Sequence, residues 1–250
     1  AKVFLADDGM LRQVLNRRQP EEVGSAHIGS LLLREMGAVP IALDVKELVS
    51  THMAILAGTG SGKSYTAGVL VEELLSPYNR AAVLIFDPHG EYGTLTDMRG
   101  QSAFQADGYA PTVKVMTPED IKIRVSSLDY YDVLTLLPEM SERQKAILSK
   151  AFRLLQRHKH GDFRWGIQEL LSADVQVDED GNEKAGSSAP ALEWKLEKLE
   201  RSEYFHRVEH TVSPKDLFEP GQVTVLQMNE ISQEEQQVIC AAVLRQANQA

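Results

Sequence analysis

Residues 57–64 of the chain read Ala-Gly-Thr-Gly-Ser-Gly-Lys-Ser. This stretch is typical of a phosphate-binding loop, because its glycines let backbone amides approach phosphates and its Gly-Lys-Ser end opens a helix. The apolar residues 52–56 before it predict a buried strand, and the spacing of apolar side chains in residues 65–75 predicts a helix. Strand, glycine-rich turn and helix in this order predict a parallel α/β sheet with a nucleotide at its edge.

Each residue type of the loop has a distinct task. Lys63 would reach the β- and γ-phosphates as a point charge, and the hydroxyl of Ser64 would complete a Mg²⁺ shell. The usual first glycine is replaced by Ala57, and the next glycines can absorb the turn. The alternatives are a turn that binds nothing and a dinucleotide site, which Lys63 excludes by standing at the third glycine position. The predicted nucleotide-binding residues are Gly58, Thr59, Gly60, Ser61, Gly62, Lys63, Ser64 and Tyr65.

A second group of polar residues follows the apolar run 81–86 and reads Asp-Pro-His-Gly-Glu-Tyr-Gly over residues 87–93. The carboxyl ends of parallel strands meet at one edge of a sheet, so this group is expected beside the phosphate loop. Asp87 would hold Mg²⁺ directly or through water, and Glu91 would orient or deprotonate an attacking water. The alternative for Asp87 is a cap on the following turn. The predicted catalytic residues are thus Lys63, Asp87 and Glu91.

Composition sets limits on the class of protein. The 250 residues carry a net charge of −10 from 26 basic and 36 acidic side chains, which argues against coating nucleic acid with the whole surface and leaves a local basic channel open. The single cysteine excludes an intrachain disulfide and fits a reducing compartment, so we expect a cytoplasmic protein. No apolar run is long enough to span a membrane.

The chain is expected to divide into four parts. Residues 1–45 would be the end of a small β module, and residues 46–118 the first part of the nucleotide-binding core. Residues 119–205 would form a helical insertion with a mobile acidic loop over 174–190, and residues 206–250 would continue the core. Shorter strands are predicted over 112–116 and 223–228, and Ser141 with Gln144 predicts a capping box.

The richest cluster of basic residues lies on the predicted helix 142–160. Its side chains recur at three- and four-residue steps, so several share one face. Such a face is either an ordinary solvated surface or a lining that contacts DNA phosphates. No helix-turn-helix or zinc-finger spacing accompanies it, so reading of base sequence is not expected. The residues predicted to contact DNA are Lys150, Arg153 and Arg157.

Four strings occur together in this chain: residues 27–29, residues 40–44, the phosphate loop and residues 87–92. In this order they resemble the HerA family of ATP-driven DNA translocases, in the HerA/FtsK branch of P-loop ATPases. The string Asp-Pro-His-Gly-Glu-Tyr carries most of the resemblance, and the similarity is strongest over residues 27–93.

The resemblance implies a RecA-like core preceded by a small β-barrel, with helices inserted. It also implies a homo-hexameric ring that threads double-stranded DNA using ATP and Mg²⁺. Relatives commonly work beside a nuclease of the NurA type in processing DNA ends, and others are paired with effectors in antiphage defence. Transferred to this sequence, Lys63 and Ser64 would bind phosphate and Mg²⁺, with Asp87 and Glu91 in the magnesium and water network.

The chain also departs from the family pattern. Relatives carry a later strand that ends in Glu-Glu-Ala-His and supplies the catalytic glutamate, and no such string occurs here; the nearest is Asn229-Glu230. The arginine given to a neighbouring subunit is expected further along as well. We therefore expect an incomplete chain that binds ATP and hydrolyses it weakly when isolated, because losing such an arginine slows phosphoryl transfer by about 10³- to 10⁵-fold.

Three other functions compete with a DNA motor. The first is a nucleotide-gated ring that scaffolds an effector enzyme. The second is a GTPase, for which residues 97–100 match Asp-x-x-Gly, although no apolar strand precedes them and no Asn-Lys-x-Asp string reads guanine. The third is a small-molecule kinase, which the phosphate loop alone leaves open and the string 87–92 argues against.

Overall fold

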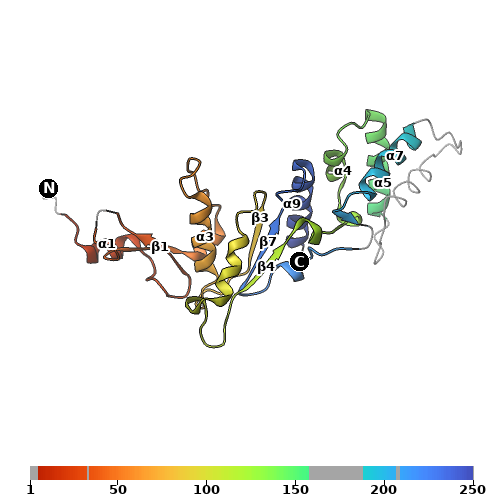
Figure 1. Ribbon diagram of the computed structural model, residues 1–250. Helices are drawn as coiled ribbons and strands as arrows, with labels where there is room; N and C mark the ends of the chain where they lie inside the picture. Colours follow the sequence, from red (N-terminus) through yellow and green to blue (C-terminus); the bar gives the residue numbers. More distant parts are fainter. Residues whose placement is uncertain (1–4, 33, 158–187, 207–208, 250) are drawn as a thin grey trace. The chain divides into compact units, whose positions relative to one another are not determined.

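The computed structural model describes residues 5–32, 34–157, 188–206 and 209–249. The chain divides into two compact units, one formed by residues 1–115 with 217–227 and the other by residues 116–216 with 228–250. Figure 1 follows the chain through both. A mixed α/β fold with a parallel strand pair and covering helices agrees with the predicted P-loop ATPase core.

Unit 1 begins with α1 (Asp8–Leu15), whose first turn is capped by Asp7. Two strands follow, β1 (Ser25–Ser30) and β2 (Pro40–Asp44), and they pair antiparallel. In the described residues this two-stranded sheet is the whole β structure of the N-terminal region. The β-barrel predicted here is therefore not confirmed.

The main sheet of unit 1 has the order β3-β7-β4, formed by β3 (Val83–Asp87), β7 (Gln222–Gln227) and β4 (Thr112–Met116). Strands β3 and β7 are parallel, with Asp87 opposite Gln227 at their carboxyl ends. All three strands agree with the sequence prediction. Helix α3 (Lys63–Leu74) and the 3₁₀ segment η1 (Gly93–Gly100) cover one face. The apolar core on that face consists of Val71, Leu75, Leu95, Met98, Val113, Val223 and Val225.

One predicted strand is absent. Residues 52–56, which follow the short helix α2 (Val45–Ser50), have no strand partner in the described part of the chain. Met53 is 48% exposed and Leu56 is 91% exposed. An apolar run becomes a buried strand only where neighbouring strands take up its backbone hydrogen bonds, and β3 pairs with β7 instead. The prediction of a buried strand over 52–56 was therefore wrong for this structure.

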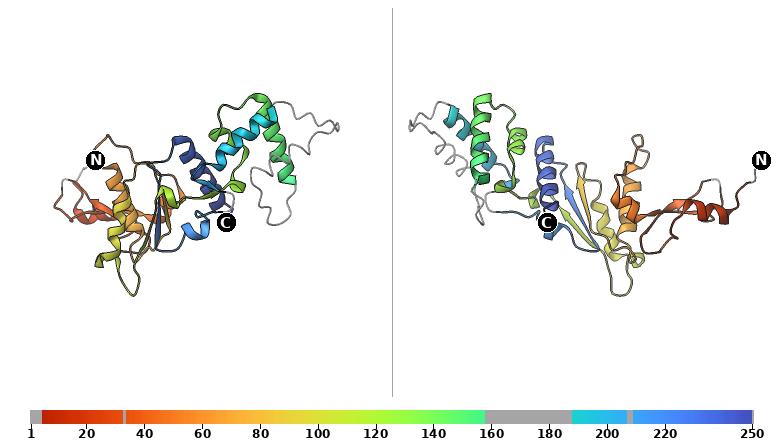
Figure 2. Two further views of the ribbon diagram at one scale, coloured as in Figure 1. Left: turned by 45° about the vertical axis from the view of Figure 1, so that its right-hand side comes forward. Right: turned by 180° about the vertical axis from the view of Figure 1, so that it is seen from behind.

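The N-terminal hairpin is bonded to Glu73 in the last turn of α3 and to Asn79 in the loop that follows this helix. Glu73 accepts the amide of His27 at 2.8 Å and the hydroxyl of Tyr78 at 2.7 Å. Asn79 donates to the carbonyl of Ser25 at 2.6 Å and accepts the amide of Gly24 at 2.9 Å. Figure 2 shows the hairpin beside this helix from two further directions. These bonds join β1 directly to the helix that starts at the phosphate loop.

Unit 2 is mainly helical. Its helices are α4 (Tyr130–Leu136), α5 (Glu142–Arg157), α7 (Ser188–Glu200), α8 (Pro214–Leu217) and α9 (Gln233–Ala247), and its strands β5 (Ile123–Arg124) and β6 (Phe205–His206) are parallel. Short 3₁₀ segments lie at Ser102–Phe104 in unit 1 and at Pro118–Asp120 and Val125–Ser127 in unit 2. The predicted capping box is present, since Ser141 and Gln144 exchange bonds of 3.0 and 3.3 Å. Of the predicted acidic loop, residues 174–187 lie outside the described residues, and 188–190 already belong to α7.

An ion pair joins two helices of unit 2. Arg245 on α9 bonds to the carboxylates of Asp132 and Asp129, the latter at 3.2 Å. Asp132 is 4% exposed, so its charge lies inside the unit. Burial raises the pKa of Asp132, and the bond to Arg245 opposes that rise.

Among the described residues, no helix combines the length and apolarity needed to cross a membrane.

Candidate nucleotide site

The phosphate loop leads directly into α3, as the sequence predicts. Gly62 stands just before the helix with φ 90° and ψ 24°, and Gly60 has φ 75°, both in the left-handed region that favours glycine. The amide of Thr66 bonds to the carbonyl of Gly62 at 2.9 Å, so the amides of residues 63–65 precede the first hydrogen bond of the helix. Free amides and the positive end of the helix dipole together favour an anion here.

Space around the loop is open. A Cβ placed on Gly58, Gly60 or Gly62 would meet no atom within 4 Å. Residues 57–63 and Tyr65 are exposed, Tyr65 at 78%, and Ser64 is half-buried. Ser61 stabilises the turn by donating to the carbonyl of Gly58 at 2.5 Å. In the described residues Lys63 has no ion-pair partner. Its ammonium is therefore available to a ligand.

Asp87 lies where the sequence places it, at the carboxyl end of β3, and it is 1% exposed. Its Oδ1 accepts the amides of His89, Gly90 and Glu91 at 3.3, 2.8 and 3.1 Å, and its Oδ2 accepts the amide of Tyr92 at 3.0 Å. Gly90 has φ 72°, which lets the loop close around the carboxylate. The contacts match the cap on the turn rather than direct ligation of a metal.

Glu91 is brought to the phosphate loop. Its Oε2 accepts the hydroxyl of Ser64 at 2.5 Å, which joins the loop after β3 to the start of α3. Tyr92 stands beside the same hydroxyl. The pKa of Tyr92 is raised, mainly by burial. The negative charges of Glu91 and Asp87 raise it further, and the hydrogen bond with Ser64 lowers it. The two groups of residues predicted to share one edge of the sheet are therefore in direct contact.

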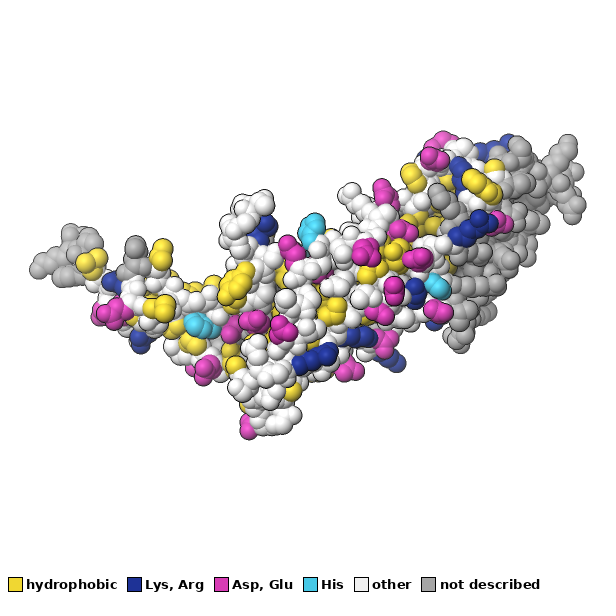
Figure 3. Space-filling model, viewed as in Figure 1, with side chains coloured by type: hydrophobic (Ala, Val, Ile, Leu, Met, Phe, Trp, Pro, Cys, Tyr) yellow, Lys and Arg dark blue, Asp and Glu magenta, His cyan; other side chains and the backbone are white. Residues whose placement is uncertain are grey.

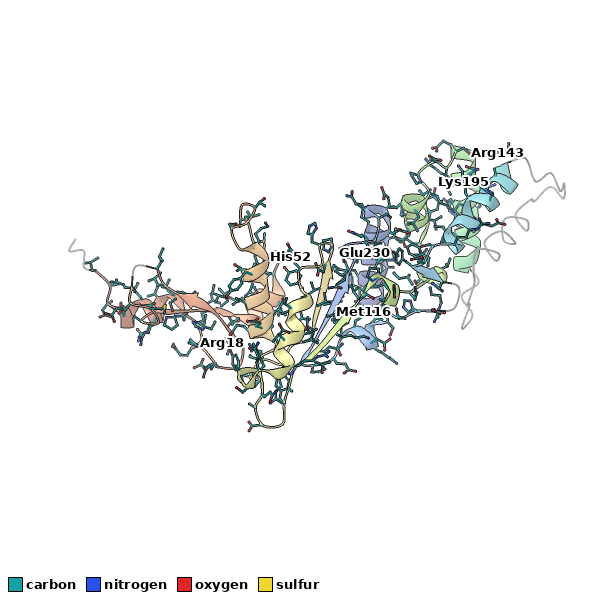
Figure 4. All side chains as sticks on the ribbon, in the orientation of Figure 1. Arg18, His52, Met116, Arg143, Lys195 and Glu230 are labelled. Atoms are coloured by element: carbon teal, nitrogen blue, oxygen red, sulfur yellow. The ribbon has the colours of Figure 1, made fainter. Side chains whose placement is uncertain are left out.

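Gln227, at the carboxyl end of β7, was not among the predicted site residues. A Cβ on Gly93 would lie 3.1 Å from its Nε2, so this amide lies against the loop that follows Asp87. The signal in the sequence was a polar residue ending an apolar strand. Glu230, the predicted nearest match to the family's glutamate, is exposed and belongs to unit 2, as Figure 4 marks it.

The donor set suits a magnesium nucleotide. Backbone amides and an ammonium are ligands for phosphate, and one hydroxyl with a carboxylate beside it is what a magnesium ion takes from a protein when phosphates and water supply the rest. The described residues hold no group of three or more His, Cys, Asp or Glu side chains that could form an all-protein metal site.

The predicted basic face on α5 is partly described. Arg143, Lys150 and Arg153 are exposed, whereas the side chain of Arg157 and residues 158–160 lie outside the description. Lys145 pairs with Glu142 at 2.8 Å, and that hydrogen bond raises the pKa of Lys145. Figure 3 shows basic side chains on the helical part of unit 2, and Figure 4 labels Arg143 there. The opposite face packs inward through Leu148, Ala151 and Phe152.

Several known proteins are similar to this chain. The family model described as "Helicase HerA, central domain" matches residues 26–247. The DNA double-strand break repair helicase HerA of Pyrococcus furiosus is 32% identical over 173 residues, covering 68% of this chain and 27% of that protein. The protein of the same name from Sulfolobus acidocaldarius is 28% identical over 204 residues, covering 78% of this chain and 36% of that protein.

A solved structure shares the fold. VirB4 of Thermoanaerobacter pseudethanolicus matches with a TM-score of 0.51 and 15% identity, over 93% of this chain and 64% of that one. The chain spans only about a third of the length of the two curated relatives above. Because the family model covers most of its residues, the chain belongs to the HerA helicase family and corresponds to the central domain of that family.

Proposed function

We propose that the chain is the nucleotide-binding part of an ATP-dependent DNA translocase or helicase. The observation that carries this proposal is the exposed glycine loop at the start of α3, with the hydroxyl of Ser64 bonded to Glu91. Relatives named as DNA double-strand break repair helicases support a role in processing DNA ends. A homo-hexameric ring and a nuclease partner of the NurA type are part of the same proposal.

Each residue around the phosphate loop has its own role in the proposed site. The amides of residues 63–65 and the ammonium of Lys63 bind the phosphate oxygens, and the free helix terminus adds its dipole. Ser64 contributes a hydroxyl oxygen to Mg²⁺, and Glu91 holds the proton of that hydroxyl. When bound, the magnesium ion neutralises charge that develops on the transferred phosphoryl group. Asp87 keeps the loop of Glu91 in place through four amides.

ATP hydrolysis coupled to DNA tests the proposal. We expect the full-length protein to hydrolyse ATP with Mg²⁺. We expect duplex DNA to raise the rate, because a DNA translocase couples hydrolysis to movement along DNA. Release of phosphate is measured with and without duplex DNA, with GTP in place of ATP as the matched nucleotide. A rate of hydrolysis that duplex DNA does not change, together with effector activity that needs only the assembled ring, would favour the nucleotide-gated scaffold. Equal use of GTP would contradict the assignment to ATP.

The exposed basic face of α5 is proposed to contact DNA phosphates. Arg143, Lys150 and Arg153 point to solvent without an ion-pair partner in the described part of the chain. Replacing Arg153 with glutamate removes one phosphate contact. We expect the slope of log affinity against log salt to become shallower by about one unit or more.

That slope is measured by fluorescence anisotropy of a labelled duplex over a series of salt concentrations. Lys215→Glu provides the matched charge reversal, since Lys215 is exposed in the same unit on the short helix α8. An Arg153→Glu slope equal to that of Lys215→Glu would show that α5 is an ordinary solvated face.

A further inference from the structure

The bond between Ser64 and Glu91 fixes the direction of a proton. A serine hydroxyl has one hydrogen and two lone pairs, and the hydrogen of Ser64 is committed to Oε2 of Glu91 at 2.5 Å. Tyr92 is also hydrogen-bonded to Ser64. Because the hydrogen of Ser64 is committed to Glu91, Tyr92 donates to one lone pair of Oγ, and the other lone pair remains for a cation. Mg²⁺ needs an oxygen of this kind at about 2.1 Å.

Asp87, the other carboxylate of this edge, is engaged by the backbone. Its Oδ1 accepts three backbone amides and its Oδ2 accepts a fourth, so one acceptor position on Oδ2 stays open. With 1% of its surface exposed, it also lacks room for a hydrated ion. Glu91 differs in both respects, since it is exposed and its side chain bonds only to Ser64 among the described residues.

We propose that Glu91, rather than Asp87, is the carboxylate that serves the magnesium ion of the nucleotide site. Glu91 holds the proton of Ser64 and thereby turns a lone pair of Oγ toward the metal, while Asp87 is a positioning residue that fixes the loop of Glu91. This inference rests on the proposed nucleotide-binding function. It transfers to Glu91 the role at the magnesium ion that the sequence analysis predicted for Asp87.

Distance supports the assignment. A cation bound to Ser64 Oγ at about 2.1 Å lies at most about 4.6 Å from the carboxylate oxygen that accepts the hydroxyl proton. One metal-bound water spans such a separation. Glu91 is therefore near enough to accept a hydrogen bond from a water of the ion without displacing Ser64.

The charge of Glu91 gives the proposal a measurable signature. Without a cation, the carboxylate of Glu91 beside the phosphate loop repels a triphosphate. With Mg²⁺ present, the same carboxylate attracts the ion, and the ion in turn binds the triphosphate. The ratio of ATP affinity in magnesium to affinity in EDTA therefore reports on Glu91 without any measurement of hydrolysis.

The test titrates a fluorescent ATP analogue into wild type and Glu91→Gln, in MgCl₂ and in EDTA. We expect the magnesium-to-EDTA affinity ratio to fall about tenfold in Glu91→Gln, because partners of a metal ligand typically contribute 10- to 100-fold to metal affinity. Affinity in EDTA should stay equal or tighten. Glu35→Gln is the matched control, since Glu35 is exposed in unit 1 and its side chain has no hydrogen bond or ion pair in the described residues.

A double variant distinguishes coupling from a general electrostatic effect. If Glu91 acts through Ser64, then Ser64→Ala lowers the same ratio, and Ser64→Ala with Glu91→Gln lowers it no further. An unchanged ratio in Glu91→Gln, with ATP binding retained in the wild type, would overturn the inference and leave the proposed function intact. Loss of any detectable ATP binding by the wild type itself would instead reject the nucleotide site.

Discussion

Replacing Lys63 with alanine is expected to lower the affinity for MgATP by about 100-fold, the largest effect in the nucleotide site. The ammonium is exposed, has no ion-pair partner in the described chain and stands at the first residue of α3 beside three free amides. A hydrogen bond to a charged group contributes up to about 3 kcal/mol, which corresponds to roughly two orders of magnitude in affinity. Isothermal titration calorimetry with MgATP measures the loss.

The fold should not change, since Lys63 makes no contact that the fold needs. Thermal unfolding of Lys63→Ala is therefore expected to match the wild type within about 0.5 kcal/mol. Lys46→Ala is the matched control, because Lys46 is an exposed lysine on α2, in the same unit. Equal MgATP affinity in the two variants would remove the basis for the phosphate site.

The second large effect concerns stability. Arg245→Ala leaves the charge of Asp132 buried at 4% exposure with its main partner gone. Removing one member of a buried ion pair costs about 3–5 kcal/mol, and the lower end applies because Arg245 keeps a third of its side chain in solvent. We expect a loss of about 3 kcal/mol in the free energy of unfolding at pH 7, measured by urea denaturation.

The loss should depend on pH in a definite direction. Burial raises the pKa of Asp132 in the folded chain, and removal of Arg245 takes away the bond that opposes this rise. A carboxyl group whose folded pKa exceeds its unfolded value favours folding in its protonated form. The deficit of Arg245→Ala is therefore full at neutral pH and shrinks as the pH falls through the folded pKa of Asp132.

A second substitution separates charge from packing. In the Arg245→Ala background, Asp132→Asn removes the uncompensated charge and keeps the shape of the side chain. We expect it to recover part of the lost stability at pH 7 and to abolish the pH dependence of the deficit. If Arg245→Ala were equally destabilised at pH 5 and pH 7, lost packing of the arginine stem would be the cause instead.

Local sequence signals predicted much of the core. The apolar runs that became β3, β4 and β7 are continuous, so period and composition sufficed. The capping box of Ser141 and Gln144 and the glycine-lysine-serine start of α3 are local as well, because each depends on residues within one helical turn. The prediction of a strand over residues 52–56 was wrong for the opposite reason. A strand in a parallel sheet forms only with partners remote in sequence, and the described part of the chain provides none for these residues.

The site divides in the same way. The sequence placed Asp87 and Glu91 at the right edge, and it could not tell which acid faces the phosphate loop. That choice depends on the path of the loop after β3, where Gly90 turns four amides inward onto Asp87. Once those amides occupy Asp87, Glu91 is the carboxylate left to meet Ser64. A motif shows which residues share a loop and does not reveal how the backbone orients them.

The bonds from Glu73 and Asn79 to β1 have a mechanical consequence for a nucleotide-driven protein. They fasten the N-terminal hairpin to the far end of the helix whose first turn would hold the phosphates. A shift of that helix along its axis would therefore move the hairpin in the same direction, because the two are joined by direct hydrogen bonds. Strain arising at the phosphates would reach the N-terminal strands as displacement.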